Sequence, residues 1–421
     1  MNLKLTICCF FAFNLTFNGY SQETQDSTSK TKSLVEIAKS VIEQEKPKTE
    51  QKKSHWYEKI NLRGYVQIRY NRLLETNPDL KSEQGDRSIG NNGGFFIRRA
   101  RLIFSGQLND HVYMYIQPDL ASSASTTGLH FAQLRDAYFD VSIDKKKEFR
   151  FRIGQSKIPY GFENMQSSQN RLPLDRNDAF NSAVSNERDL GVFFYYAPKK
   201  VRELYSSLVN DGLKGSGDYG VLAFGTYNGQ TANKPEGNNN SHWAARATYP
   251  FQIGNQIIEP GIQMYSGFYK LDQTTAGVKT YTNAEYLDER YAASFVLYPK
   301  PFGIQAEYTM GKGPQYDRLT DSILKKDLKG GYVTLSYIIK AKDQFIIPFS
   351  RYTYYEGGKK HELDARAYKT KDIECGIEYQ PWKYFEITAS WVYAERWTSD
   401  KAKKDNMQMG SFLRVQCQLN F

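Results

Sequence analysis

The chain has 421 residues, of which 56 are Lys or Arg and 46 are Asp or Glu, so its formal net charge is +10. Its mean hydropathy of -0.63 is hydrophilic, and after the first residues no stretch approaches the roughly 20 apolar residues of a membrane-spanning helix. A bundle of membrane helices is therefore excluded. Aromatic residues nevertheless reach 14%. A transmembrane β-barrel reconciles these facts, because only alternate side chains of its strands face lipid; a soluble β-rich protein is the alternative.

The N-terminal residues 1–21 predict a secretory signal peptide, since Lys4 precedes an apolar run over residues 5–17, and Gly19 and Ser21 are small residues near the expected cleavage site. Residues 22–58 are rich in Gln, Ser, Thr, Lys and Glu, a composition that does not fold alone. Apolar residues recur at helical spacing only over residues 34–42. This leader forms either a short coiled-coil or docking helix, or a mostly disordered periplasmic segment. The helical pattern is too short for stable pairing, which favours the disordered segment.

From residue 59 to residue 421, apolar and polar side chains alternate, which is the pattern of half-buried strands. In the first strand Val66 and Ile68 alternate with Gln67 and Arg69, and in the second Arg98 interrupts the outer, apolar face. Sixteen such runs occur, near residues 60–70, 96–108, 112–119, 137–143, 149–153, 190–197, 219–228, 242–249, 256–269, 287–298, 303–310, 331–339, 345–355, 373–380, 385–396 and 410–421.

Short connections take turns with long polar ones, which is the arrangement of outer-membrane barrels with both termini in the periplasm. Residues 198–218 break this rule, because a long charged connection replaces a short turn, and this indicates a misplaced strand boundary. We expect an all-β fold, a transmembrane antiparallel barrel of about 16 strands, in the outer membrane of a Gram-negative bacterium. The terminal Phe421 resembles the aromatic signal read by the barrel-assembly machinery.

A long polar insertion, residues 154–191, separates two of these strands. Connections of this length without regular structure usually bind, cover or constrict something. Its charge is mixed: the bases are Lys157, Arg171, Arg176 and Arg188, and the acids are Glu163, Asp175, Asp178, Glu187 and Asp189. We expect this loop to fold inward and to narrow the bore.

Arginines crowd the inward face of the first five strands. Guanidinium groups hold oxyanions bidentately and stay charged, so a ladder of them can form an anion pathway. Alternatively, each arginine pairs with a lumen carboxylate, such as Asp119 or Glu259, and only solvates the bore. For any single arginine the pairing is favoured, whereas for the cluster as a whole the anion pathway is favoured. With two loop residues added, the candidates are Arg63, Arg69, Arg99, Arg101, Arg150, Arg152, Lys157, Arg171 and Arg246.

Catalytic motifs are lacking. The five histidines show no HExxH spacing and no GxSxG motif is present. A lipase would need a Ser/His pair brought together in space. We therefore expect no enzyme activity, no metal or other cofactor, and no nucleic-acid partner.

Four segments, GFFIRRARLIFSGQL (94–108), RDAYFDV (135–141), GQSKIPYGFENMQSSQNRLPLDR (154–176) and NERDLGVFF (186–194), together resemble the phosphate-selective porin O and P family, of the type found in Bacteroidetes. The similarity continues more weakly through YNGQ (227–230) and RATYP (246–250). It implies a trimeric, sixteen-stranded channel whose third outer loop folds into the bore and whose basic ladder passes phosphate. By position it points to Lys157, Arg171, Arg99 and Arg101.

The expected function is passive diffusion of small inorganic anions, with phosphate and polyphosphate as candidates. The alternatives are a general porin with weak charge preference and an attachment barrel that does not conduct. The expected partners are these anions, outer-membrane lipid, the barrel-assembly machinery and two further copies of the chain in a homotrimer.

Overall fold

The computed structural model describes residues 55–81, 89–120 and 131–421. The chain divides into two units, Met1–Ser54 and His55–Phe421, and the second contains the strands. The signal peptide and the helix expected over residues 34–42 lie outside the described residues. The domain boundaries expected from the sequence therefore stay predictions.

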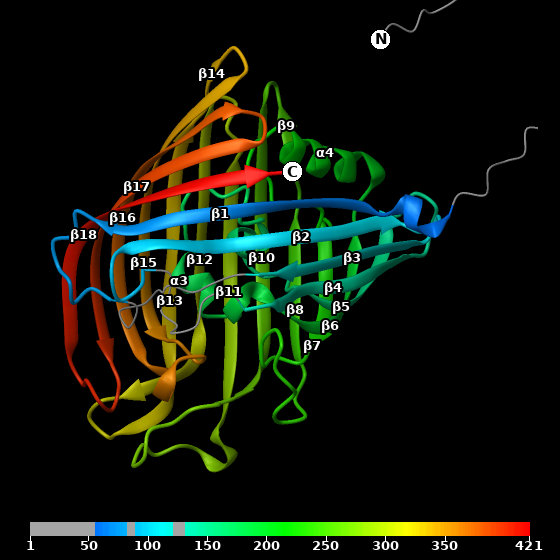
Figure 1. The fold of residues 1–421 in the computed structure, drawn as a ribbon. Coiled ribbons are helices and arrows are strands. Elements are labelled where there is room, and N and C mark those ends of the chain that lie inside the picture. The colour runs from blue at the N-terminus through cyan, green and yellow to red at the C-terminus, as the bar shows by residue number, and fades with distance from the viewer. Residues whose placement is uncertain (1–54, 82–88, 121–130) are drawn as a thin grey trace, which may run out of the picture. The chain divides into compact units, whose positions relative to one another are not determined.

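Antiparallel strands form one closed sheet in the described part of the chain (Figure 1). The barrel closes where β1 (Asn61–Leu73) pairs with β18 (Asn406–Asn420). The strands between them are β2 (Gly94–Gln107), β3 (Val112–Asp119), β4 (Gln133–Ser142), β5 (Phe149–Lys157), β6 (Arg188–Tyr196), β7 (Leu222–Tyr227), β8 (His242–Thr248), β9 (Phe251–Ile253), β10 (Gln256–Lys270), β11 (Glu285–Leu297), β12 (Phe302–Asp317), β13 (Ser322–Tyr337), β14 (Ile339–Ala341), β15 (Gln344–Gly358), β16 (Ala367–Trp382) and β17 (Phe385–Ser399).

Two of these strands are short continuations of their predecessors. Both β8 and β9 pair with β10, and both β13 and β14 pair with β15. Counting each of these pairs as one strand reduces the eighteen strands of the sheet to sixteen. The predicted all-β barrel of about 16 strands is thereby confirmed.

The helical segments are short. They are η1 (Trp56–Lys59), α2 (Phe162–Met165), α3 (Asp178–Asn181), η3 (Ser185–Glu187), α4 (Lys199–Asn210), η4 (Thr282–Ala284) and η5 (Leu363–Ala365). Within the described ranges, no helix combines the length and the apolar composition needed to cross a membrane.

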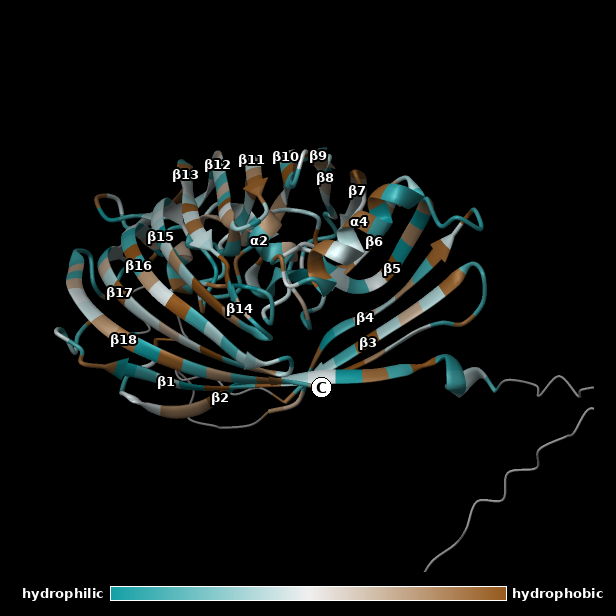
Figure 2. Cartoon of the chain, turned by 90° about the horizontal axis from the view of Figure 1, so that it is seen from above, coloured by the Kyte–Doolittle hydropathy of each residue, from teal (hydrophilic) through white to brown (hydrophobic). Residues whose placement is uncertain are grey.

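The alternation in the sequence separates the two faces of the sheet. On β4 and β5, Phe139 and Phe151 are exposed on the outer surface, whereas Asp140 and Arg152 are buried on the lumen side. Figure 2 shows the same alternation as hydrophobic and hydrophilic bands along the strands. The outer surface thus suits lipid and the lumen is polar.

We call the end of the barrel at which β1 begins and β18 ends the terminal end, and the opposite one the loop end. Connections at the terminal end are short, except for the one that contains α4 (Figure 1). The strand boundaries expected on either side of this helix were close to those found, so the inference of a misplaced boundary was wrong. The extra residues form a helix because Val201, Tyr205 and Leu208 recur at helical spacing and are buried together.

Candidate functional site

The insertion between β5 and β6 lies inside the barrel. We call residues 158–187 the inner loop. On one side the Tyr160 hydroxyl lies 2.6 Å from Thr309 Oγ1 of β12, and on the other the Ser168 hydroxyl lies 2.6 Å from the Tyr65 hydroxyl of β1. The loop therefore crosses the lumen, and α2 lies within the ring of strands in Figure 2. The predicted inward-folded loop is confirmed.

Lumen side chains fix the course of the inner loop. Glu307 of β12 accepts the backbone N–H groups of Phe162 at 2.6 Å and Glu163 at 2.9 Å. Arg290 of β11 donates to the Ala179 carbonyl at 3.1 Å and the Ser182 hydroxyl at 2.7 Å. Because these partners lie on strands, the barrel wall holds the loop in one position.

An apolar cluster fills one side of the lumen. Its inner-loop members pack against inward-facing aromatic side chains of the wall: Ile158, Tyr160, Ala179, Phe180, Ala183 and Val184 against Phe193, Tyr195, Tyr227, Tyr265, Tyr332 and Tyr355. The wall members named here lie on β6, β7, β10, β13 and β15. Most of the candidate arginines, by contrast, lie on β1, β2 and β5.

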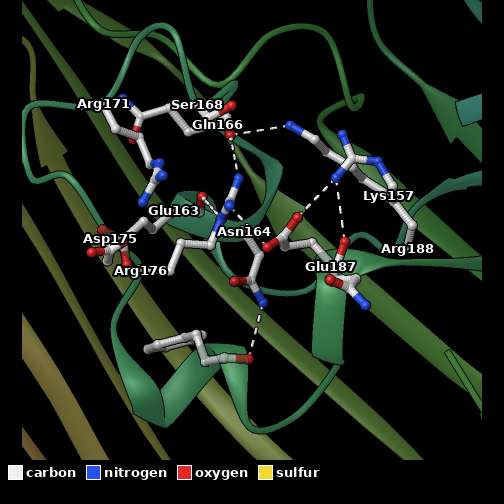
Figure 3. A network of polar contacts seen from close by, with 12 residues as sticks. Lys157, Glu163, Asn164, Gln166, Ser168, Arg171, Asp175, Arg176, Glu187 and Arg188 are labelled. Atoms are coloured by element: carbon white, nitrogen blue, oxygen red, sulfur yellow. Dashed lines mark hydrogen bonds and ion pairs between the residues drawn. The ribbon is translucent and has the colours of Figure 1, made fainter. Parts of the chain in front are cut away.

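The acids of the inner loop are bonded to basic groups or to backbone N–H groups, and Figure 3 shows the ion pair between Glu187 and Arg188. Glu187 forms ion pairs with Arg135 at 3.3 Å and with Arg176 and Arg188, both at 2.8 Å. Glu163 pairs with Arg351 of β15 at 2.9 Å. These two carboxylates are thus already neutralised.

The remaining acids are engaged in the same way. Asp178 pairs with Lys359 at 2.9 Å. Asp189, which follows the loop at the start of β6, accepts the N–H groups of Gly229 at 2.7 Å and Thr231 at 3.0 Å. The small excess of acids over bases in the insertion therefore does not make its surface acidic.

Asp175 of the inner loop is surrounded by arginines. Arg69 of β1 pairs with it at 3.0 Å, Arg414 of β18 bonds it, and Arg98 of β2 lies 3.8 Å away. Three guanidinium groups thus surround one carboxylate.

Arg98 reaches Asp175 because of a β-bulge. The register of β1 and β2 shifts so that Gln67 opposes Arg99 but Ile68 opposes Ile97, which leaves Arg98 as the extra residue. A bulge re-aims a side chain. The sequence pattern placed Arg98 on the outer face and so missed this contact, as strict alternation carries no signal for an inserted residue.

Three of the predicted candidates are buried cations that pair with no carboxylate among the described residues. Arg99 is 4% exposed and donates to Gln67 Oε1 at 2.8 Å. Arg171 is 5% exposed and makes only a 3.4 Å bond, to the Leu174 carbonyl, while its Nε and Nη1 have no partner in the part of the chain described. Lys157 donates to the Met165 and Gln166 carbonyls at 2.7 and 3.1 Å.

Most of the other candidates carry ion pairs, the arrangement expected of side chains that solvate the bore. The pairs are Arg101 with Asp119 at 2.7 Å, Arg150 with Asp218 at 2.8 Å, Arg152 with Asp140 at 2.8 Å and Arg246 with Glu259 at 2.8 Å. Arg63 is exposed near the start of β1.

Arg99 lies near enough to Arg98, Arg101 and Arg171 for their charges to interact. The structure therefore brings these four arginines together at the inner loop.

A sequence model of the family described as phosphate-selective porin O and P matches residues 77–421. The chain belongs to this family. It is an outer-membrane porin, a channel rather than an enzyme, as the resemblance and the closed barrel predicted. A search of curated protein sequences found no match.

Solved structures of porins share the barrel of this porin. Salmonella typhi OmpF in complex with daunomycin has a TM-score of 0.54 at 13% identity, and the outer membrane channel DcaP of Acinetobacter baumannii has a TM-score of 0.52 at 16% identity. Each match covers 86% of this chain and 97% of the other. OmpT of Vibrio cholerae in its trimer form has a TM-score of 0.51 at 11% identity, covering 86% and 99%. At these identities the likeness shows the fold alone.

Proposed function

We propose that this porin conducts small anions, inorganic phosphate among them, by passive diffusion past Arg99, Arg171 and Lys157. The observation that carries the proposal is the charge imbalance at the inner loop: these cations are buried and have no acid partner among the described residues. A buried charge without a partner is costly. An anion in the passage would supply the missing partner.

The geometry favours selectivity as well as attraction. Electrostatic fields are screened over about 10 Å at 0.1 M salt, so fixed charges select strongly only where a passage is narrow on that scale. Arg171 of the inner loop lies near enough to Arg99 of β2 for their charges to interact. The name of the family supports phosphate as one of the solutes.

Membrane orientation and assembly belong to the same proposal. The short connections at the terminal end support a periplasmic position for this end and hence for the N-terminus. The trimer form of OmpT of Vibrio cholerae supports a homotrimer. Outer-membrane lipid and the barrel-assembly machinery would then be its other partners.

The test is a triple substitution, Arg99, Arg171 and Lys157 each to Gln, in single-channel recordings across a salt gradient. Loss of the three unbalanced charges should move the zero-current potential toward cation preference, more at low salt than at high salt. A matched control removes three exposed charges, Lys199, Lys312 and Lys369 each to Gln. If both triple variants keep the potential of the parent, the general porin with weak charge preference is the better description.

A further inference from the structure

A cavity of about 420 Å³ lies near the terminal end, between β3 to β5, the inner loop and the α4 connection. Met165 to Asn170 of the loop and Tyr205 to Asn210 of α4 contribute walls that the strands alone would not supply. The helix that replaces a short turn thus bounds a chamber of a size that suits a small organic ligand. The proposed anion passage at Arg99, Arg171 and Lys157 accounts for one cation of this lining but not for its tyrosines and amides.

Tyrosine rings form part of this lining. Tyr113, Tyr115, Tyr138 and Tyr219 all line the cavity and are half-buried. Tyr115 and Tyr138 are stacked, with ring centroids 5.1 Å apart and planes inclined by 11°. The Arg152 guanidinium lies 4.0 Å from the centroid of Tyr138. Tyr138 is thus covered by Tyr115 and Arg152, and the outer face of this stack is that of Tyr115; flat apolar faces are the surfaces on which rings of ligands stack.

Most of the rest of the lining is polar and of both charge signs. Lys157 reaches the cavity with no carboxylate partner in the described residues, whereas Arg188 is bonded to Asp136 at 2.8 Å. Gln117, Gln169 and Asn170 add amide groups. A lysine without an acid partner can bind an anionic group. The carboxylates beside it accept hydrogen bonds, and the amides both donate and accept them. Together they suit a ligand that carries one anionic group and several hydroxyls.

We propose that this cavity binds a phosphorylated sugar on its way through the channel, with the sugar ring against the Tyr115 ring and the phosphate toward Lys157. The proposal rests on the anion passage proposed above and names an organic class of solute for it. Inorganic phosphate would use the cation but leave the tyrosines and amides without partners. An apolar aromatic acid would use the rings but would bury the polar lining unsatisfied.

The test uses the purified full-length porin in planar bilayers, with chloride carrying the current and glucose 6-phosphate, glucose or inorganic phosphate added. Glucose 6-phosphate should reduce the current at a half-blocking concentration about tenfold below those of the other two probes, since it alone combines stacking with charge. Tyr115→Ala should raise this concentration about fivefold. Tyr115→Phe keeps the ring, so its half-blocking concentration should stay near that of the parent. Tyr308→Ala removes a ring from the outer surface and is the matched control for the loss of a tyrosine side chain.

Two results would overturn the inference: equal half-blocking concentrations for glucose 6-phosphate and inorganic phosphate, or an unchanged value in a folded Tyr115→Ala barrel. The zero-current potential separates this inference from the proposed function. A parent without anion preference means that the proposed function has failed. A parent that prefers anions but treats the two phosphates alike means that only the sugar site has failed.

Discussion

Glu187 is the carboxylate on which the charge balance of the inner loop depends. Burial acts to raise its pKa, but the charges of Arg176, Arg135, Arg188 and Lys157 together hold that pKa well below its usual range. A carboxyl whose pKa is depressed by folding stabilises the fold above its unfolded pKa of about 4.3, and this contribution is lost as the pH falls through the folded pKa. The loop should therefore keep its anchor at neutral and mildly acidic pH.

Replacing Glu187 with Gln should destabilise the barrel. The change leaves buried guanidinium groups without their shared counter-charge, and breaking a buried ion pair typically costs about 3 to 5 kcal/mol. We expect a lower midpoint of thermal unfolding, measured by loss of the heat-modifiable form. The control is Glu203→Gln, because Glu203 is 65% exposed on α4 and pairs only at 3.7 Å with Lys199. Equal midpoints for the two variants would show that Glu187 is not an anchor.

The alternation of apolar and polar residues in the sequence predicted which arginines face the lumen, but not which of them lack an acid partner. Arg99 and Arg101 share a strand and a face, yet among the described residues only Arg101 has an acid opposite it, Asp119 of β3. Other pairs join residues far apart in sequence, as do Arg351 and Glu163. Such pairing depends on how the inner loop folds, and alternation carries no information about that.

At the scale of elements, the inner loop should set the conductance. Deleting residues 166–183 removes α3 and the part of the loop that contacts β1, so the open cross-section should increase and the single-channel conductance should rise. A control deletion of residues 235–240 shortens a mostly exposed connection between β7 and β8 and should leave conductance near that of the parent. Both variants need a heat-modifiable barrel for the comparison. A folded loop deletion with unchanged conductance would mean that the narrowest point lies elsewhere.

The α4 connection reaches across the lumen and meets the inner loop there. Lys214, which follows α4, pairs with Glu378 of β16 at 2.6 Å, and the Gln166 side chain donates to the Lys214 carbonyl at 2.6 Å. Both charged side chains are buried. The two inserted segments of the chain therefore meet through the Gln166–Lys214 hydrogen bond, while the buried ion pair ties the α4 connection to the barrel wall.

Lys214→Met should loosen this connection. The substitution leaves Glu378 buried without its cation, which favours detachment of residues 211–218 from the wall. Hydrogen exchange of the backbone amides in this segment should become faster, while that of β16 stays slow. Lys199→Met, at an exposed position on α4, is the matched control. Unchanged exchange in Lys214→Met would show that apolar packing of Leu213 and its neighbours holds the segment without the ion pair.

The strands could be predicted from the sequence, whereas α4 could not. Each strand repeats the same two-residue alternation, because one face meets lipid and the other meets the lumen. Val201, Tyr205 and Leu208 do show helical spacing, but over only 12 residues. Short turns are usual at this end of an outer-membrane barrel, so this weak signal was not enough to predict a helix. The contacts that make α4 a wall of the cavity come from β10 and β11, which are distant in sequence.

For the whole molecule, closure of the ring depends on the two ends of the barrel chain. The N–H of Gly64 donates to the Phe421 carbonyl at 2.8 Å, and the N–H of Phe421 donates to the Gly64 carbonyl at 3.0 Å. A Cβ atom placed on Gly64 would lie 2.6 Å from the Phe421 ring. The terminal residue therefore extends the seam between β1 and β18, and its ring lies over a position that accommodates only glycine.

Deletion of Phe421 should impair assembly in cells. It removes two hydrogen bonds from the seam, worth about 1 kcal/mol each, and it also removes the aromatic end proposed as the signal for the barrel-assembly machinery. We expect a lower level of heat-modifiable barrel at the cell surface, with Phe421→Tyr close to the parent because it keeps both the backbone and a ring. Refolding into detergent, without the machinery, separates the two causes. A truncated chain that refolds normally but fails in cells has lost the signal, and one that fails in both has lost the seam. Unchanged surface level and refolding would mean that Phe421 has neither role.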